Sequence, residues 1–404
     1  MPVYQAKVPY GVAERRPWTT LPFPAAEYER RIKAVQAGLR AEHLDALVAF
    51  SNRGDPGHVR YLSNFEAGPG DTVVVVPADG APMLSTNWLM HGEPMHTSLW
   101  ATWLDDARPA ERPGMASSIA TSVSGHAVDR LLEARSDRGQ IGLAGTPILP
   151  YRFVEDLRER LPRATWVPAD DLLFEVRARK SAVEIDAMRR AARMSGRMHE
   201  AALAALAPGT TERAVAAAAH AAAFRDGADA LAFDSAVATG PRAGLKHCAP
   251  TDRVIQSGDM VFLDMAAMTD GYFADVSRST VVGEPSAEQR RFLDTGLAMF
   301  EAALAKAAPG VPVQEMIAAA KAIAAREGYE ADYMPKGFGH GLGCSLFELP
   351  SLRPTTKSVL APGNTFALEP MLVRTHFGTA CIEETVLITE RGAEALSGCP
   401  LRVW

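Results

Sequence analysis

The sequence predicts two domains: an α/β domain over residues 1–172, then an α+β domain over residues 173–404 with an internal duplication. Three observations lead to this prediction. The 404 residues exceed the usual size of one domain. Helix-type and strand-type hydrophobic patterns alternate along the first part, as they do in α/β domains. In the second part, a pair of Ala-rich segments recurs at an offset of 101 residues.

The composition is that of an ordinary folded protein. Hydrophobic residues make up 47% of the chain and charged residues 22%, which excludes wholesale disorder and collagen-like repeats. No apolar run approaches the roughly 20 residues that span a bilayer, so we expect no membrane association. The net charge of −6 and the dispersed Lys and Arg residues leave no basic patch for nucleic acid.

Neither export nor a disulfide framework is expected. The first 18 residues contain no apolar core of signal-peptide length. Four cysteines are too few and too widely spaced for a disulfide framework, and no Cys-x-x-Cys pair suggests a structural zinc site. We therefore expect reduced thiols in a cytoplasmic protein. The four cysteines are Cys248, Cys344, Cys381 and Cys399.

The first domain alternates helices and strands. Tyr28, Ile32, Val35 and Leu39 recur at helical spacing and predict a helix with one buried face. A short apolar run over residues 45–50 predicts a buried strand. The remaining predicted elements are a strand at 72–76, a helix near 127–134, a strand near 140–143 and a helix near 152–160.

The second domain contains a repeated pattern of helices. A long helix is predicted at residues 182–205, and a second begins at Ser286, where Gln289 completes a capping box. Each long helix is followed by an Ala-rich helix that a Pro-Gly pair opens and an Arg-x-Gly sequence closes. The predicted buried stripe of the first long helix is Ile185, Met188, Ala192 and Met198. The opening and closing signals lie at 208–209 and 225–227, and again at 309–310 and 326–328.

This repeat has two interpretations. Two Ala-rich helices could look alike by chance, because Ala is a strong helix former. A duplicated helix–helix–strand unit also explains why the opening and closing signals keep the offset of 101 residues, and why apolar strands follow each helix pair. We therefore favour a duplicated unit.

Two acidic residues flank the first predicted hairpin of the second domain. Asp264 ends one apolar run, Asp275 lies in the next, and the Asp-Gly pair at 270–271 between them is a strong hairpin signal. Folding the chain back at residues 269–271 predicts that the two aspartates are cross-strand neighbours. Like charges opposite each other destabilise a sheet, and burying them unpaired is costly. Either a cation lies between the carboxylates or they share a proton.

The second half repeats this arrangement with glutamates. Glu369 and Glu383 lie at equal distances from His376, so a turn around residues 375–378 brings them face to face. His340, in a glycine-rich stretch, adds an imidazole. Four carboxylates and one imidazole suit a pair of divalent ions, Mn²⁺, Co²⁺, Fe²⁺ or Zn²⁺. Any one acid alone could be a surface charge, but the five residues together favour a metal site.

Other catalytic arrangements are absent from the sequence. It has no Gly-x-Ser-x-Gly elbow and no His-Glu-x-x-His motif, and the glycines around His340 match neither a dinucleotide fingerprint nor a phosphate-binding loop. Cys248, Cys344 and Cys381 adjoin the carboxylate segments and are expected to be buried packing residues rather than nucleophiles. Seven histidines are expected to be surface or packing residues: His43, His58, His91, His96, His126, His199 and His220.

These motifs together resemble metallopeptidase family M24, which includes methionine aminopeptidase, aminopeptidase P, prolidase and creatinase. The resemblance covers nearly the whole chain. Residues 177–186 are similar to the helix that leads into the family's catalytic domain, and residues 60–65 to a recurring segment of the N-terminal domain of creatinase and prolidase. The resemblance implies a pita-bread fold for the second domain, and a homodimer.

The resemblance also implies a role for each site residue. Asp264 would bind the first metal ion, His340 and Glu369 would hold the second, and Asp275 and Glu383 would bridge both. The two ions would activate a water molecule and polarise the scissile carbonyl. Glu369 would accept the proton of that water and pass it towards the leaving nitrogen.

The resemblance is weaker in the substrate pocket. His247 matches the family's substrate-contacting histidine and would steady the substrate or the oxyanion; the alternative is a solvated loop histidine. Phe347 stands where the family often has a histidine, and Cys381 where aminopeptidase P and prolidase commonly have an arginine. The two substitutions remove polar groups that handle the substrate carbonyl or carboxylate in those relatives, so we expect an altered substrate pocket.

The expected function is a dinuclear metal-dependent hydrolase. It would cleave an amide or peptide C–N bond in a small-molecule or short-peptide substrate, in the manner of an Xaa-Pro peptidase but with an altered pocket. The alternatives are creatinase-like or ectoine-hydrolase-like cleavage of a non-peptide C–N bond, a lyase reaction, and a catalytically silent binding module. The last is disfavoured because all five ligand positions are filled.

Overall fold

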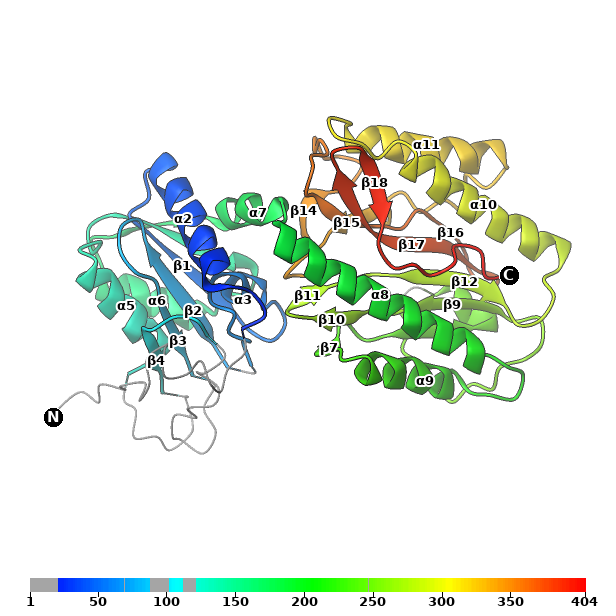
Figure 1. Cartoon of the computed structure of the whole chain (residues 1–404), viewed down its shortest axis with the longest axis horizontal. Coiled ribbons are helices and arrows are strands. Elements are labelled where there is room, and N and C mark those ends of the chain that lie inside the picture. The colour runs from blue at the N-terminus through cyan, green and yellow to red at the C-terminus, as the bar shows by residue number, and fades with distance from the viewer. Residues whose placement is uncertain (1–20, 69, 88–101, 112–120, 246) are drawn as a thin grey trace. The chain divides into compact units, whose positions relative to one another are not determined.

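The computed structural model describes residues 21–68, 70–87, 102–111, 121–245 and 247–404. The chain divides into two compact units, Met1–Val176 and Arg177–Trp404, which are considered in turn (Figure 1). The division lies within helix α7 (Asp170–Ala178), where the sequence predicted a boundary at residue 172.

The first unit is built on a six-stranded mixed sheet in the order β4-β3-β2-β1-β5-β6. Strands β1, β5 and β6 run parallel, whereas β2 is antiparallel to both β1 and β3. The strands are β1 (Ala46–Ser51), β2 (Thr72–Pro77), β3 (Met83–Thr86), β4 (Ala107–Pro109), β5 (Gln140–Ala144) and β6 (Thr165–Pro168). Besides α7, its helices are α2 (Ala25–Ala41), α3 (Gly57–Ser63), α5 (Val123–Glu133) and α6 (Tyr151–Arg160), with the short η1 (Thr146–Ile148).

Most sequence predictions for this unit are confirmed. The three predicted strands correspond to β1, β2 and β5, and the helices near 127–134 and 152–160 to α5 and α6. The predicted stripe of α2 is buried, because it faces the core. Strands β3, β4 and β6 were not predicted, since three or four residues give too short a pattern to read. The predictions for residues 1–18, His91 and His96 lie outside the described residues.

The second unit contains two pairs of helices. Helix α8 (Ala182–Ala205) has the predicted bounds, and α10 (Ala287–Leu304) begins with the predicted capping box. The Ala-rich helices α9 (Glu212–Arg225) and α11 (Val313–Arg326) begin three residues after their Pro-Gly pairs rather than at them. The intervening residues form a bridge to another segment in each half, Thr211 with Val254 and Pro312 with Val359. These bridges repeat the same local structure.

The strands of this unit form a large sheet whose order is symmetric about its centre. The order β14-β13-β15-β17-β12-β9-β8 places β17 and β12 side by side, flanked by β15 and β9 and then by β13 and β8. Strands β16 and β18 also pair with β17, and β11, β10 and β7 form a small separate sheet. The first-half strands are β7 (Ala230–Leu231), β8 (Ala236–Thr239), β9 (Met260–Asp264), β10 (Ala267–Thr269), β11 (Tyr272–Phe273) and β12 (Ser277–Val281), with the short η2 (Gly240–Gly244). The second-half strands are β13 (Gly339–Gly341), β14 (Glu348–Ser351), β15 (Thr365–Leu368), β16 (Met371–Arg374), β17 (Gly378–Thr389) and β18 (Gly392–Ala395).

Each helix pair packs on the strands of its own half, which confirms the predicted duplication (Figure 1). The first core contains residues of α8, α9, β8 and β9: Met198, Val215, Ala219, Val237, Val261 and Leu263. The second contains residues of α10, α11, β15 and β17: Phe292, Phe300, Met316, Phe366, Leu368 and Ile388. The second core also includes Met260 and Phe262 of β9 and Val281 of β12, so it extends over strands of both halves.

The register of the first hairpin differs from the prediction by two residues. Its turn is Asp270-Gly271, with φ of 53° and 76°, and it joins Thr269 to Tyr272. Asp264 consequently lies opposite Ser277 rather than opposite Asp275. The two aspartates are diagonal neighbours, because a tight two-residue turn shifts every later pair.

The second hairpin has the predicted register. Strands β15 and β16 pair with β17 in one continuous register, from Leu368 opposite Glu384 to Met371 opposite Cys381. Position 369 therefore falls opposite position 383, as the symmetry about residue 376 predicted.

Candidate metal centre

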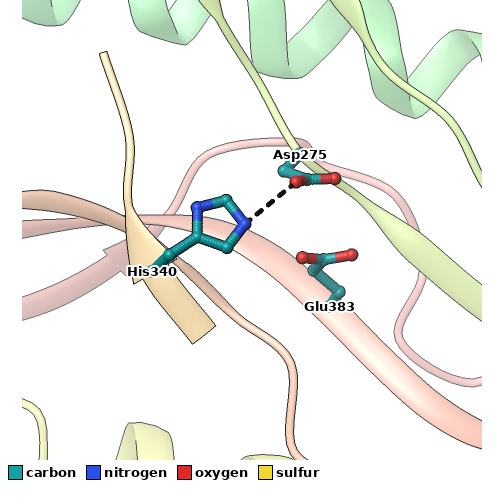
Figure 2. Close-up of side chains that lie close together, drawn as sticks. All are labelled: Asp275, His340 and Glu383. Atoms are coloured by element: carbon teal, nitrogen blue, oxygen red, sulfur yellow. Dashed lines mark ion pairs between the residues drawn. The ribbon is translucent and has the colours of Figure 1, made fainter. Parts of the chain in front are cut away.

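Three of the five predicted ligands lie close together. One ligand atom each from Asp275, His340 and Glu383 fall within 4.8 Å of one another. Asp275 precedes β12, His340 belongs to β13 and Glu383 to the central strand β17. The His340 ring points toward Asp275, with 3.4 Å between Nε2 and Oδ2, and the Glu383 carboxylate lies beside them (Figure 2).

The other two predicted ligands flank this cluster. Asp264 ends β9, and Glu369 follows β15 at the position opposite Glu383. Burial raises the pKa of Glu383 well above its usual value, and the charges of Asp275, Glu369 and Asp264 raise it further. The fold thus gathers four carboxylates and one imidazole from five separate segments.

These residues fit a divalent cation. Burial favours a low pKa for His340, but its hydrogen bond to Asp275 and the charges of Asp275 and Glu369 outweigh this and raise the pKa. Neighbouring carboxylates contribute to both shifts, and a cation would neutralise their negative charge. In addition, the buried Oδ1 atom of Asp275 has no hydrogen-bond partner among the described residues. Oxygen and imidazole donors without a thiolate suit Mn²⁺, Co²⁺, Fe²⁺ or Zn²⁺.

Two hydroxyl groups, which the sequence analysis did not identify, position the central acids, one through the carboxylate and one through the backbone. The Ser277 hydroxyl donates a hydrogen bond to the Glu383 carboxylate. The Thr385 hydroxyl accepts from the Asp275 N–H at 2.9 Å and donates to the Asp275 carbonyl at 3.0 Å. Each hydroxyl lies two residues after one of these acids, which is the spacing of neighbours on one face of a strand. That spacing is a signal that could have found them.

The opposite face of the two central strands carries a buried ion pair. Arg278 and Glu384 form this pair, and both are almost completely inaccessible to solvent. Ser397 donates to Glu384 at 2.6 Å, and Arg278 also donates to the Cys399 carbonyl at 2.9 Å. Beside them, burial and the charge of Arg278 lower the pKa of His199 to about 4. Glu384 is thus the buried acid that holds Arg278 and residues 397–399 on this face.

A second buried acid anchors the segment that follows His340. The Glu348 carboxylate binds Arg177 and Lys180, with 3.0 Å between Lys180 Nζ and Oε2, and accepts from the Ser345 N–H at 2.8 Å. Burial by itself favours a higher pKa for Glu348, but the two cations lower the pKa to about 2. Residues 177–186, noted in the sequence for their resemblance, thereby hold a loop about 170 positions away.

The three predicted substrate-pocket residues lie in different environments. Phe347 is 65% exposed, and its ring centroid is 4.5 Å from that of His340. Cys381 is buried, with its Sγ atom 4.0 Å from the Glu369 carbonyl oxygen. His247 is exposed and has a left-handed backbone, with φ of 54°. Residue 246, which precedes His247, lies outside the described residues.

The remaining predicted packing residues take ordinary positions. His58, His126 and His199 are buried. Of the four cysteines, Cys344, Cys381 and Cys399 are buried, while Cys248 is only half-buried. No helix among the described residues is long and apolar enough to cross a membrane.

Comparison with known proteins decides the family. Residues 186–390 match the profile of Metallopeptidase family M24, and residues 31–179 match that of the Creatinase/Prolidase N-terminal domain. The chain belongs to metallopeptidase family M24. It is accordingly a metal-dependent hydrolase with the two-domain, pita-bread architecture that its sequence predicted.

Its relatives in this family include dipeptidases. The chain is 32% identical to the Xaa-Pro dipeptidase of Pyrococcus furiosus over 67% of its own length and 76% of that protein. It is 30% identical to the Probable dipeptidase PepE of Mycobacterium tuberculosis over 94% of its length and 96% of that protein. Among solved structures, dipeptidase PepE from Mycobacterium ulcerans matches with a TM-score of 0.79 and 26% identity, covering 94% of this chain and 98% of that one. The prolidase from Pyrococcus furiosus matches with a TM-score of 0.76 and 26% identity, covering 90% and 99%.

Proposed function

We propose that this protein is a dinuclear metal-dependent dipeptidase that cleaves a peptide or related C–N bond in a short, Xaa-Pro-like substrate. The observation that carries the proposal is the cluster of Asp275, His340 and Glu383, flanked by Asp264 and Glu369. The Xaa-Pro dipeptidase and prolidase named among the relatives support the substrate class. We further propose a cytoplasmic homodimer, and a monomer mass of 43.3 kDa in sedimentation would contradict the dimer.

The ligand roles are those that the family resemblance implies, and the positions of the residues are compatible with them. Asp275 and Glu383, next to one another at the centre, would bridge two ions. Asp264 at the end of β9 would hold the first ion, and His340 with Glu369 would hold the second. A pair of divalent ions, when bound, polarises the scissile carbonyl and lowers the pKa of a water molecule.

The protein's own residues would move protons and orient the substrate. Glu369 stands at the edge of the cluster opposite Glu383, where its carboxylate can accept a proton from the attacking water and deliver it to the leaving nitrogen. His247 would donate a hydrogen bond to the substrate oxygen on which charge develops. Its side chain is exposed, so it is accessible to a substrate.

An aromatic ring beside His340 would make the pocket different from that of a peptidase with a polar wall. Phe347 is apolar and exposed next to a candidate ligand, so it would contact the substrate without hydrogen-bonding it. Cys381 would likewise leave a substrate carboxylate without a charged partner. These two residues keep a second candidate open: hydrolysis of a non-peptide C–N bond in a small metabolite, or a lyase reaction.

Metal analysis and a substrate panel test the proposal. Protein purified without chelator should contain about two divalent ions per chain and lose turnover in EDTA. Xaa-Pro dipeptides should be hydrolysed, and Glu369→Gln should lower turnover by about 10²–10⁴-fold with the fold intact. Glu390→Gln, at an exposed acid in the turn between β17 and β18, is the matched control. Full activity in EDTA would refute the metal mechanism, and activity only on non-peptide amides would favour the second candidate.

A further inference from the structure

A buried carboxylate outside the metal centre holds both ends of the loop that carries His247. Glu212, the first residue of α9, is completely inaccessible to solvent. Its Oε1 atom accepts from the N–H and the hydroxyl of Thr239, at 2.9 and 3.0 Å. Its Oε2 atom accepts from the N–H and the hydroxyl of Thr251, at 3.0 and 2.6 Å. Arg242 adds a charged contact at 3.2 Å.

These contacts bracket the loop at its base. Thr239 ends β8 and precedes His247, whereas Thr251 follows it. One carboxylate therefore binds both ends of the loop. Arg242 also donates to the Ala249 carbonyl at 2.7 Å, which ties the two sides together above the base. The loop also packs closely against the end of β16 at Gly244. A Cβ atom added at Gly244 would lie only 2.6 Å from the Arg374 carbonyl oxygen. His247 is left at the tip of a loop whose base has little freedom.

The duplication shows that the fold itself does not need this carboxylate. The offset of 101 residues places Val313 in the second half at the position of Glu212 in the first. Their backbones are equivalent: the Glu212 N–H donates to the Arg253 carbonyl at 3.3 Å, and the Val313 N–H donates to the Ser358 carbonyl at 3.1 Å. Val313 is also fully buried but lies in the apolar core. An acid is present only in the half whose loop carries His247.

We infer that Glu212 is a positioning residue, which fixes the 239–251 loop so that the His247 imidazole can meet the substrate. The inference rests on the proposed function, since it gives His247 a task. Burying a carboxylate raises the free energy of the folded state unless its hydrogen bonds are satisfied. Both oxygens of Glu212 accept hydrogen bonds from the two ends of a single loop. The strained backbone of His247 is held by these contacts around it.

The first test measures the loop without measuring activity. Because the other three cysteines are buried, the thiol reagent dithionitrobenzoate should react with Cys248, next to His247, in the native protein. Glu212→Gln replaces an acceptor oxygen by an NH₂ group that faces donors, and should raise the reaction rate by about tenfold. Val313→Ala, at the equivalent buried position of the second half, should leave the rate unchanged. The pKa of the Cys248 thiol is raised by burial and by the charge of Glu212, so the rate is measured across pH to separate thiolate fraction from accessibility.

The second test is a double-mutant cycle on kcat/KM with the substrate found for the wild-type enzyme. If Glu212 acts through His247, Glu212→Gln should lower kcat/KM in the wild type but have little further effect in a His247→Ala background. Thr251→Val, which removes one donor to the carboxylate and keeps the volume, should give a smaller effect of the same pattern.

The outcomes separate this inference from the proposed function. Additive losses in the cycle, or an unchanged Cys248 rate in folded Glu212→Gln and Thr251→Val, would overturn the positioning role while leaving the peptidase proposal intact. Wild-type protein that binds metal but hydrolyses no peptide would overturn the proposed function instead. In that case an accelerated Cys248 reaction would still establish that Glu212 holds the loop.

Discussion

The two halves of the second unit agree at the metal centre and differ in the loops around it. Asp275 and Ser277 of the first half correspond to Glu383 and Thr385 of the second, each pair offset by 108 residues (383 − 275 and 385 − 277). In both halves an acid is followed two residues later by a hydroxyl that bonds to the acid of the other half. Ser277 bonds to the Glu383 carboxylate, and Thr385 bonds to the backbone of Asp275. These two segments, 275–277 and 383–385, are therefore symmetric, and together they are called the ion-binding seam below because they carry candidate ion ligands.

The loops do not keep this symmetry. In the first half an acid on the helix, Glu212, binds the loop, whereas in the second half the acid lies in the loop itself, as Glu348, and binds cations that precede α8. The duplicated strands therefore carry one symmetric set of candidate ion ligands, whereas the two loops beside them differ.

If the two halves contribute equally to the metal centre, replacing one candidate ligand in either half should lower turnover by the same large factor. If both acids are the bridging ligands proposed above, Asp275→Asn and Glu383→Gln should each lower kcat by about 10³-fold, because the change removes several kcal/mol of transition-state stabilisation. Metal content measured on the same samples should fall in both variants. A variant that keeps wild-type turnover would show that its half does not contribute to the site.

The loop anchor of the second half should matter mainly for stability. Glu348→Gln leaves Arg177 and Lys180 buried without their counter-ion, and should lower the free energy of unfolding by about 3–5 kcal/mol in denaturant titrations. Glu390→Gln is the exposed control and should change it little.

The same variant has a defined pH dependence. The folded-state pKa of Glu348 is about 2, below the ordinary value of 4.5, so its stabilising contribution is complete above about pH 4.5 and is lost as the pH falls towards 2. The difference in unfolding free energy between wild type and Glu348→Gln should therefore be constant from pH 7 to 5 and shrink below that. A difference that grows on acidification would contradict the assigned ion pair.

The crossed hydroxyls offer a finer test of equivalence. Ser277→Ala and Thr385→Val should each weaken metal binding by about 10–100-fold without removing a ligand, since outer contacts orient the ligands. Competition with a metallochromic chelator measures the affinity. Effects that differ by more than about tenfold would show that one half dominates the ion-binding seam.

The smallest effect is expected at the pocket wall. Phe347→His restores a polar group beside His340 and should change kcat/KM for Xaa-Pro dipeptides by about tenfold, the value of one hydrogen bond to substrate. Metal content should stay the same, because Phe347 contacts the ring of His340 without being a candidate ligand. No change on any peptide would indicate that the ring does not contact the substrate.

The sequence predicted the frame of the molecule better than its internal connections. The bounds of α8 and the capping box of α10 follow from local signals. Of the five predicted ligands, the structure brings Asp275, His340 and Glu383 within 4.8 Å of one another. The predicted register of the first hairpin differs from the observed register by two residues, because the register depends on which residues within 269–271 form the turn. Local patterns predict elements but leave such offsets open.

The buried ion pairs had no sequence signal. Arg278 pairs with Glu384 across 106 positions, and Arg177 with Glu348 across 171, so neither pair shares a helix turn or a hairpin. Glu212 reads as an ordinary acid in the first turn of a helix, which is where the helix dipole favours acids. Only the folded chain distinguishes it from a surface residue.

The antiparallel pairing of β12 with β17 bears on how such a domain can arise. Two identical chains that meet edge to edge across a two-fold axis form an antiparallel strand pair with the same residues on both sides. In such a dimer, one acid and one hydroxyl per chain supply both crossed contacts at once. Joining the copies in a single chain removes the need for identity, so position 212 can carry a carboxylate while position 313 carries valine. Fusion of two copies therefore allows the ion-binding seam to stay symmetric while the loops of the two halves differ in sequence.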